Sequence, residues 1–238
     1  MFQKIYTTLR EIKWNLRTTF RLMPIVWNIW DFVYIHKTIG FRTARLWGGG
    51  SIYLRNYSDI QILLEIFENS YGMTTYYPTV GDIGANIGMF SVFYARRFPD
   101  AVIDAFEPEP NNFKLLLQNT APYKNISCHN TAIGSEAGAV TLFLDKKNLG
   151  RHSVHKGWVR ESGAVTVPME TLNKKYDLLK IDTEGAEYDI LKTLPECQRI
   201  VMEIHEIEGE SQEKLIQHLS EKFAVTDLGG HVFSCVAK

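Results

Sequence analysis

Cysteine is scarce in this sequence, with three residues among 238. Cys128, Cys197 and Cys235 are odd in number, far apart in the chain and without the close spacing of paired metal ligands. A disulfide framework and a zinc site are therefore not expected. Such low cysteine usage is typical of an intracellular protein, and we expect a cytoplasmic location.

Long apolar runs are also missing. The most apolar stretch, residues 22–35, contains Asp31 and is shorter than the ~20 residues that a membrane-spanning helix needs. Near the N-terminus, Arg10, Glu11 and Lys13 interrupt the segment in which a secretory signal peptide would have its apolar core. We therefore expect neither a membrane span nor a signal peptide.

An excess of charge of one sign is absent as well. The 26 Lys and Arg residues against 27 Asp and Glu residues give a net charge of -1. Surfaces that bind nucleic acid are basic, so no nucleic-acid partner is expected. The charge is uneven, however, because residues 1–47 hold eight basic and two acidic residues, a sum of +6 that leaves -7 for residues 48–238. A basic arm thus precedes an acidic body.

Short apolar strands alternate with amphipathic helices from residue 79 onward. This alternation predicts a doubly wound α/β fold, a mostly parallel sheet with helices on both faces. Seven strands are expected, over residues 80–83, 101–106, 126–133, 176–181, 199–204, 224–228 and 232–237, of which the last two form an antiparallel hairpin. Helices are expected to begin at Ser58 and Pro110 and to cover residues 186–194 and 215–223, and residues 140–144 are expected to pair as a hairpin.

A glycine-containing turn follows the strand predicted at residues 80–83. Gly84 and Gly88 allow the backbone to approach a ligand closely and the next helix to pack tightly on the strand. Asp82 lies at the carboxyl end of this strand, where doubly wound sheets bind ligands. A carboxylate there suits an ammonium group and repels a pyrophosphate. Asn86 replaces the central glycine of a dinucleotide fingerprint, so a dinucleotide is not indicated.

A second acidic residue follows the next predicted strand. Glu107 lies 19 residues beyond Gly88, where an acidic side chain accepts hydrogen bonds from both hydroxyls of a ribose. An adenosine that carries an amino acid satisfies both Asp82 and Glu107. The alternative is that each carboxylate only caps a helix. We favour the nucleoside site because both residues occur in a strand–turn–helix–strand order.

At this point the sequence resembles a known family. Residues 82–88, with the pattern D-x-G-x-N-x-G, resemble the first motif of class I methyltransferases that depend on S-adenosylmethionine (SAM). Residues 180–187, KIDTEGAE, are similar to the signature of the FkbM-type branch, and residues 53–60 to its entry segment. The resemblance covers about residues 50–238 and implies the seven-stranded, Rossmann-like class I fold.

The resemblance implies an enzyme that uses SAM as its cofactor. It implies methyl transfer to an oxygen, often on sugars, polyketides or other natural products. Asp82 and Gly84 would face the methionine moiety and Glu107 the ribose. The cofactor-binding residues implied in this way are Asp82, Gly84, Asn86 and Gly88 at the turn, Glu107 at the ribose, and Asn130 and Ala132 at the edge of the adenine.

Methyl transfer to a hydroxyl gains from a general base, because a neutral hydroxyl is a weak nucleophile. His205 has the unperturbed pKa best suited to a base near neutrality, whereas Asp182 lies nearest the expected methyl position. Two alternatives stay open: carboxylates that only stabilise a helix N-terminus, and a buried histidine held by a neighbour. The candidate catalytic residues are Lys180, Asp182, Glu184 and His205, with Glu187, Glu203 and Glu206 nearby in the sequence.

A divalent metal is a further interpretation of this group. Asp182, Glu203 and His205 could converge on an ion that polarises the acceptor hydroxyl. Nothing in their spacing requires a metal, and none is assigned. His152 and His155 could line the acceptor site, although a solvated loop is the simpler interpretation.

The sequence thus predicts a SAM-dependent O-methyltransferase that acts on a hydroxyl of a carbohydrate or glycan-like acceptor. A non-sugar natural product or a lipid is the alternative acceptor. A different class of protein, a module that binds SAM without turnover, is disfavoured because such a module needs no convergent carboxylates.

Residues 1–47 fall outside the resemblance. We expect them to form a helical extension of one or two amphipathic helices, interrupted near Pro24, ahead of a methyltransferase domain at residues 48–238. Three interpretations are a lid over the acceptor site, the arm of a homodimer and a peripheral anchor to an acidic membrane surface. A lid or dimer arm is favoured, because Trp and Phe at helical spacing usually pack on protein.

Overall fold

The computed structural model describes residues 18, 20–27, 42–68, 71–145, 152–156 and 161–238. The chain divides into two compact units, Met1–Glu68 and Asn69–Lys238, and each is described by itself. The helices expected over residues 1–40 lie almost entirely outside the described residues. They stay a prediction, as does a domain boundary after residue 47. No helix within the described ranges is both long and apolar enough to cross a bilayer.

The first unit contains a small antiparallel sheet. β1 (Arg42–Arg45) pairs with β2 (Ser51–Leu54). The turn between the two strands contains three glycines with positive φ, at positions 48, 49 and 50. Glycine adopts such angles without steric cost, so the hairpin can turn sharply at this point.

An amphipathic helix, α2 (Tyr57–Phe67), follows this sheet. The side chain of Asn56 accepts a hydrogen bond from the Asp59 N–H at 3.1 Å and so caps the helix. The expected start at Ser58 was therefore late, because Asn56 already has the extended backbone and the side-chain acceptor that a cap needs.

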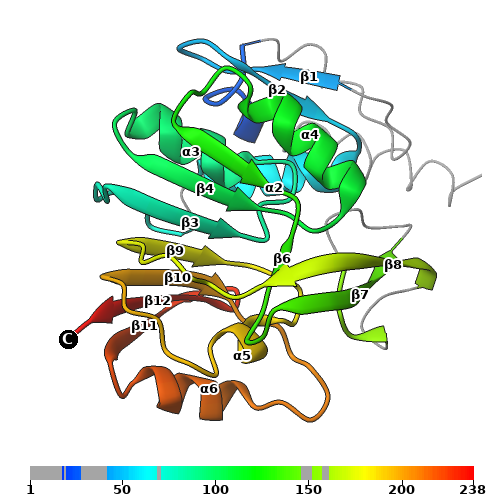
Figure 1. Cartoon of the computed structure of the whole chain (residues 1–238). Coiled ribbons are helices and arrows are strands. Elements are labelled where there is room, and N and C mark those ends of the chain that lie inside the picture. Colours follow the sequence, from blue (N-terminus) through cyan, green and yellow to red (C-terminus); the bar gives the residue numbers. More distant parts are fainter. Residues whose placement is uncertain (1–17, 19, 28–41, 69–70, 146–151, 157–160) are drawn as a thin grey trace, which may run out of the picture. The chain divides into compact units, whose positions relative to one another are not determined.

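The second unit is built on a seven-stranded sheet in the order β11-β12-β10-β9-β3-β4-β5 (Figure 1). Neighbouring strands pair in parallel except at β12, which is antiparallel to β10 and to β11. The doubly wound, mostly parallel sheet with a closing hairpin is thus confirmed. The strands are β3 (Thr79–Ile83), β4 (Val102–Phe106), β5 (Ile126–His129), β9 (Leu178–Ile181), β10 (Arg199–Glu203), β11 (Phe223–Gly229) and β12 (Val232–Ala237).

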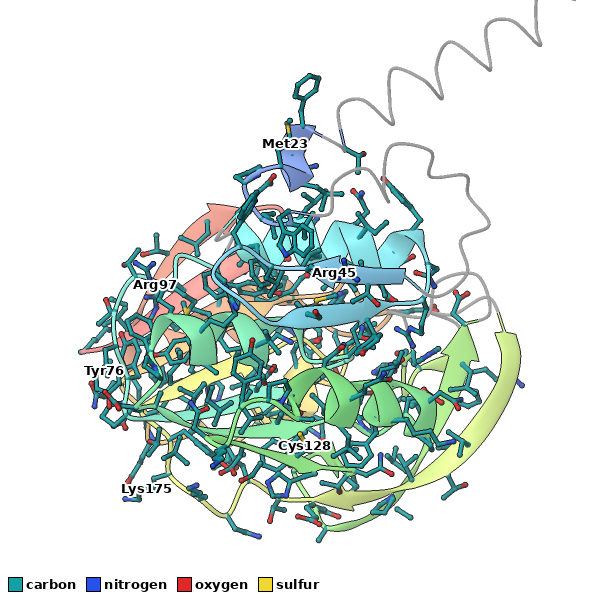
Figure 2. All side chains as sticks on the ribbon, turned by 90° about the horizontal axis from the view of Figure 1, so that it is seen from above. Met23, Arg45, Tyr76, Arg97, Cys128 and Lys175 are labelled. Atoms are coloured by element: carbon teal, nitrogen blue, oxygen red, sulfur yellow. The ribbon has the colours of Figure 1, made fainter. Side chains whose placement is uncertain are left out.

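Helices cover both faces of this sheet (Figure 1). α3 (Met89–Arg97) and α4 (Pro110–Thr120) lie on one face, and α5 (Glu187–Ile190) and α6 (Gln212–Leu219) lie on the other. α4 packs on β5, where Thr120 Oγ1 lies 3.3 Å from the Sγ of Cys128, which is labelled in Figure 2.

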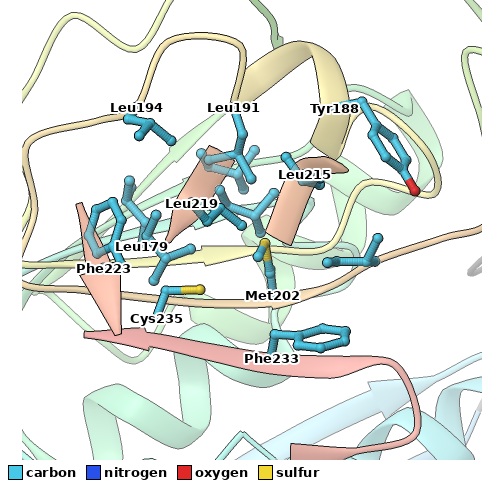
Figure 3. Packing of buried hydrophobic residues seen from close by; sticks show 14 of the residues in the cluster. Leu179, Tyr188, Leu191, Leu194, Met202, Leu215, Leu219, Phe223, Phe233 and Cys235 are labelled. Atoms are coloured by element: carbon cyan, nitrogen blue, oxygen red, sulfur yellow. The ribbon is translucent and has the colours of Figure 1, made fainter. Parts of the chain in front are cut away.

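A hydrophobic core lies between α6 and the sheet (Figure 3). Leu215 and Leu219 of α6 pack with Leu179 of β9 and Met202 of β10, and all four side chains are buried. Burial of each such side chain contributes roughly 1.5–3 kcal/mol to folding. This packing fixes the ends of β9 and β10, the strands that carry the candidate catalytic residues.

A second, three-stranded sheet in the order β6-β8-β7 corrects the sequence prediction. The strand expected over residues 126–133 is two strands, because the chain leaves the main sheet after β5 and enters the small sheet as β6 (Ala132–Ile133). β7 (Gly138–Asp145) covers the expected hairpin strand at 140–144. Its partner β8 (Glu161–Glu170) was not predicted, because Gly163 and Pro168 interrupt the strand pattern.

Two helix predictions also need correction. The helix expected over residues 186–194 is the single turn α5. The helix expected over residues 215–223 begins earlier, at Gln212, because Ser211 caps it by accepting the Lys214 N–H at 3.3 Å. It ends at Leu219, before β11 begins at Phe223.

Candidate functional site

A cavity of about 370 Å³ lies at the carboxyl ends of β3, β4 and β9. The small sheet supplies one wall through Ile133, Leu142 and Met169. Six residues expected from the sequence line this cavity: Gly84, Asn86, Glu107, Ala132, Asp182 and Glu184. The pocket therefore lies where a doubly wound sheet binds its ligand.

The turn after β3 comes very close to the strand beside it. Gly84 has φ +75, and a Cβ built there would lie 1.8 Å from the carbonyl oxygen of Asp182, so only glycine fits. The N–H groups of Gly84 and Ala85 both donate to the carbonyl of Phe106, at 3.0 and 2.9 Å. Asn86 also has positive φ, +52, a region that Asn tolerates better than most residues.

Gly88 has a packing role at the end of the same turn. It has φ +89, and a Cβ there would lie 2.9 Å from Leu116 of α4. Gly88 therefore lets α3 begin tightly against α4. Gly88 is not among the residues that line the cavity. Its position fits the tight helix packing that the sequence predicts.

A buried ion pair lies beneath this turn. The side chain of Asp82 is fully buried, accepts a hydrogen bond from Ser91 Oγ at 2.6 Å, and lies 3.3 Å from the Nζ of Lys180. Lys180 Nζ also donates to the carbonyl of Gly84 at 2.8 Å. Burial alone would lower the pKa of Lys180, but the negative charges of Asp82 and Asp182 outweigh it and raise the pKa.

This geometry bears on two expectations. Asp82 is not among the residues that line the cavity, and its carboxylate supports the turn from below. Lys180, expected among the catalytic residues, is 4% exposed and positively charged, and it joins β9 to the turn after β3. Both residues hold the backbone of Gly84 in place.

Glu107 lies at the wall of the cavity and is held rigidly. Its carboxylate accepts hydrogen bonds from the N–H groups of Asn86 at 2.8 Å and Glu109 at 2.9 Å, and from the side-chain amide of Asn112 at 3.3 Å. Burial raises the pKa of Glu107 to about 7, although these hydrogen bonds act in the opposite direction. The structure thus presents an oriented carboxylate whose negative charge is disfavoured by burial.

Asn130 and Ala132 have different positions. Asn130 donates from its side-chain amide to the carbonyls of Glu107 at 2.8 Å and Pro108 at 3.1 Å, so it holds the loop that follows β4. Ala132 lines the cavity itself, next to Thr131. Thr131, which the sequence did not single out, donates to the carbonyl of Pro168 at 3.1 Å and ties the cavity edge to β8.

The far end of the cavity contains Asp182 and Glu184. The side chain of Asp182 is 29% exposed, and one of its oxygens lies 3.6 Å from the Nζ of Lys180. The hydroxyl of Tyr71, which sequence reasoning missed, donates to the same oxygen at 3.4 Å. His152 and His155 also line the cavity. This position agrees with the interpretation that they line a ligand site rather than lie in a solvated loop.

His205 lies beside this end, between carboxylates. Its Nδ1 is 3.2 Å from Glu187, and its Nε2 is 3.4 Å from Glu184 and 3.7 Å from Glu203. Burial would lower the pKa of His205, but the hydrogen bond and charge of Glu187, helped by Asp182 and Glu184, raise it to about 9. The unperturbed pKa on which the expected general base depended is therefore not the one that the structure gives.

Glu187 is held in place within this cluster by several hydrogen bonds. It is fully buried and accepts hydrogen bonds from the Thr183 N–H at 2.8 Å, the Thr183 hydroxyl at 2.9 Å and the Gly185 N–H at 3.0 Å. Gly185, with φ +111, makes the turn that brings these donors together. One interpretation of Glu187, a carboxylate that stabilises a turn and helix start, fits these contacts.

Comparison with known proteins gives the family. The model of the methyltransferase FkbM domain matches residues 82–229. Similar proteins include Methyltransferase 1 of Beauveria bassiana (28% identical; 54% of this chain, 65% of that protein) and Methyltransferase sdnD of Sordaria araneosa (31% identical; 56% and 68%). The 31-O-demethyl-FK506 methyltransferase FkbM of Streptomyces tacrolimicus is 26% identical, over 67% of this chain and 74% of that protein.

The alignment with the first of these relatives thus spans slightly less than two thirds of its length. Among solved structures, the chain is similar to the tRNA (uracil-54, C5)-methyltransferase of Pyrococcus abyssi, with 12% identity and a TM-score of 0.44 over 83% of this chain and 44% of that one. The assignment rests on the family model, which includes both the Gly84 turn and the cluster around His205. The chain belongs to the FkbM-type methyltransferase family.

Proposed function

We propose that this chain binds SAM in the cavity and transfers its methyl group to a hydroxyl of a small-molecule acceptor. The observation that carries the proposal is Glu107, a buried carboxylate held at the cavity wall beside the Gly84 turn. A carboxylate offers about four acceptor positions, and the hydrogen bonds described above use three of them. The oriented carboxylate of Glu107 can therefore still accept a hydrogen bond from a ribose hydroxyl.

The other residues of the cavity fit SAM as well. Its volume of about 370 Å³ falls within the range of roughly 300–1,000 Å³ that is usual for small-molecule sites. Phe106, Ile133 and Leu142 give an apolar lining that suits an adenine ring. Asp182 and Glu184 give negative charge at the other end, which suits the positive sulfonium and ammonium groups.

We assign Asp82 and Lys180 a positioning role. Their ion pair and the bond from Lys180 to the Gly84 carbonyl hold the turn along which the methionine moiety would lie. Ala132 and its neighbour Thr131 would contact the adenine edge, whereas Asn130 would act through the loop after Glu107. Asn86 connects the turn after β3 to the proposed ribose site, because its N–H donates to the carboxylate of Glu107.

The chemical step needs a proton acceptor near the methyl position. When bound, SAM supplies a methyl group activated by a positively charged sulfur. Asp182 lines the cavity and is the carboxylate that we assign to take the acceptor's hydroxyl proton as the oxygen–carbon bond forms and the carbon–sulfur bond breaks. The two nitrogens of His205 face Glu187 and Glu184. We therefore assign His205 a positioning role in this step.

Two acceptor classes are candidates. One similar protein is named for methylation of an FK506 precursor, which favours a hydroxyl on a polyketide-like natural product as a second candidate beside the carbohydrate expected from the sequence. Enclosure of the methyl position by the cavity walls would keep water from the reaction in either case.

Calorimetric titration with SAM and Glu107→Gln tests the nucleoside site. We expect the wild-type protein to bind one SAM and Glu107→Gln to bind at least tenfold more weakly, because a hydrogen bond to a charged group contributes about 1.5–3 kcal/mol. Asp100→Asn, at an exposed acid in the turn before β4, is the matched control and should bind normally.

Release of S-adenosylhomocysteine is then measured with a panel of sugars and polyketide alcohols. Normal SAM affinity in Glu107→Gln would remove the ribose assignment. Tight SAM binding without transfer to any acceptor in the panel would favour a binding module over an enzyme.

A further inference from the structure

Two carboxylates and a histidine converge beside the end of the cavity that Asp182 lines. One donor atom each from Asp182, Glu203 and His205 lies within 4.8 Å of the others. The Nε2 of His205 and a carboxylate oxygen of Glu203 are 3.7 Å apart. Ligand atoms bonded to one octahedral cation at about 2.1 Å lie roughly 3.0–4.2 Å from one another. Small side-chain shifts would therefore bring all three onto a single ion.

The sheet itself brings these residues together. β9 and β10 pair in parallel with Ile181 opposite Met202. The next position along each strand is Asp182 and Glu203, so the two carboxylates follow the same register at the same edge. The buried core beneath these strands makes their ends rigid, and a metal site needs ligands that are held in this way.

The orientation of the histidine is the second observation. Glu187, which is fully buried and fixed by Thr183 and Gly185, lies 3.2 Å from Nδ1 of His205. The ring therefore points its Nε2 in the opposite direction, toward Glu184 and Glu203. Metal-bound histidines commonly donate their second ring N–H to a carboxylate in this way, which fixes the ring and makes the ligating nitrogen more basic.

We propose that Asp182, Glu203 and His205 bind a divalent cation of the Mg²⁺ or Mn²⁺ class. Two carboxylate oxygens and one imidazole nitrogen form a donor set that suits such ions, and three positions of an octahedron stay available for water or substrate. Asp182 also lines the proposed SAM cavity, so the ion would lie next to the methyl position.

The proposed role rests on the proposed function. The acceptor hydroxyl oxygen binds the cation, which lowers the pKa of this hydroxyl. Its proton passes to the oxygen of Asp182 that does not hold the cation. The oxygen–methyl bond then forms as the methyl–sulfur bond breaks, giving a methyl ether and S-adenosylhomocysteine. The cation thus binds the acceptor, whereas Glu107 and the Gly84 turn bind the cofactor.

Calorimetry with Mn²⁺ alone tests the site directly. The full chain is stripped with EDTA, dialysed and titrated with MnCl₂, and we expect one site per chain. Glu203→Gln and His205→Gln should each weaken Mn²⁺ binding at least tenfold, because each removes one of three protein ligands. Glu208→Gln, at an exposed acid beyond the cluster, is the matched control and should bind Mn²⁺ like the wild type.

SAM titrations of the stripped protein and of each variant keep the two proposals apart. Normal SAM binding shows that a variant is folded and that the cofactor site is intact. SAM binding without any Mn²⁺ binding overturns the cation site and leaves the proposed function standing. Equal Mn²⁺ affinity in wild type and Glu203→Gln overturns the cation site too. Absence of SAM binding with Mn²⁺ bound overturns the proposed function instead.

Discussion

At the scale of single residues, Glu107 determines how the proposed cofactor site responds to pH. Burial raises its pKa to about 7, so the folded protein holds a proton there that an unfolded chain would lose near pH 4.5. A group with a raised pKa stabilises the fold fully below its unfolded pKa, and this contribution disappears as the pH rises through about 7. Ribose hydroxyls donate hydrogen bonds and therefore prefer the ionised form.

SAM affinity should consequently rise with pH up to about 7 and level off above it. Calorimetric titrations from pH 5.5 to 8.5 measure the SAM affinity. Below the pKa of Glu107, we expect Kd to fall by at most tenfold for each unit that the pH rises. Glu107→Gln cannot ionise and should give a flat profile over the same range. The same slope in Glu107→Gln would assign the pH dependence to another group.

The sequence indicates which residues approach the site but not how each one is used. Glu107 lies at the cavity wall, and its position after a strand decides where it points. Asp82 has the same kind of position, yet its carboxylate is taken by Ser91 and Lys180. Lys180 is almost a hundred residues away in the chain, and only the pairing of β3 with β9 brings it opposite Asp82.

At the scale of elements, the turn between β3 and α3 allows a matched test of close packing. Gly84→Ala should destabilise the protein and weaken SAM binding more than tenfold, because the new Cβ would lie 1.8 Å from the carbonyl oxygen of Asp182. Gly209→Ala is the control, since Gly209 has a similar φ of +87 and no atom within 4 Å of the new Cβ.

Both substitutions carry the cost of a left-handed residue, roughly 1–2 kcal/mol. The difference between their thermal unfolding midpoints therefore isolates the collision with the strand. Equal midpoints and equal SAM affinities would mean that the β3 turn moves aside easily, and the tight approach would then have no role in binding.

The main sheet was predictable because each of its strands carries a short apolar run between turn residues. The small sheet was not, although it forms one wall of the cavity. β6 has two residues, too few to give a pattern, and β8 contains Pro168. The break that sends the chain from one sheet to the other depends on Asn130, whose side chain binds the carbonyls of Glu107 and Pro108. Such a contact between loops leaves no periodic signal.

At the scale of the whole molecule, the charge divides between +6 in residues 1–47 and -7 in residues 48–238. In the first unit, Trp27 and Trp47 are about half exposed, and the guanidinium of Arg45 lies 5.1 Å from the ring centre of Trp27. Exposed aromatic side chains beside a cation indicate a surface that meets a partner. That partner is either protein, as a lid or dimer arm requires, or an acidic membrane.

Flotation with liposomes separates these alternatives. The intact chain and a truncation that begins at Gly48 are mixed with vesicles containing anionic lipid, and with neutral vesicles as the control. We expect neither protein to float, because Trp and Phe at helical spacing usually pack on protein, and we expect the truncation to change the oligomeric state or the KM for the acceptor. SAM binding by the truncation shows that it is folded. Flotation of the intact chain alone, and only with anionic lipid, would assign residues 1–47 to a membrane surface, because electrostatic attraction then supplements the burial of apolar side chains.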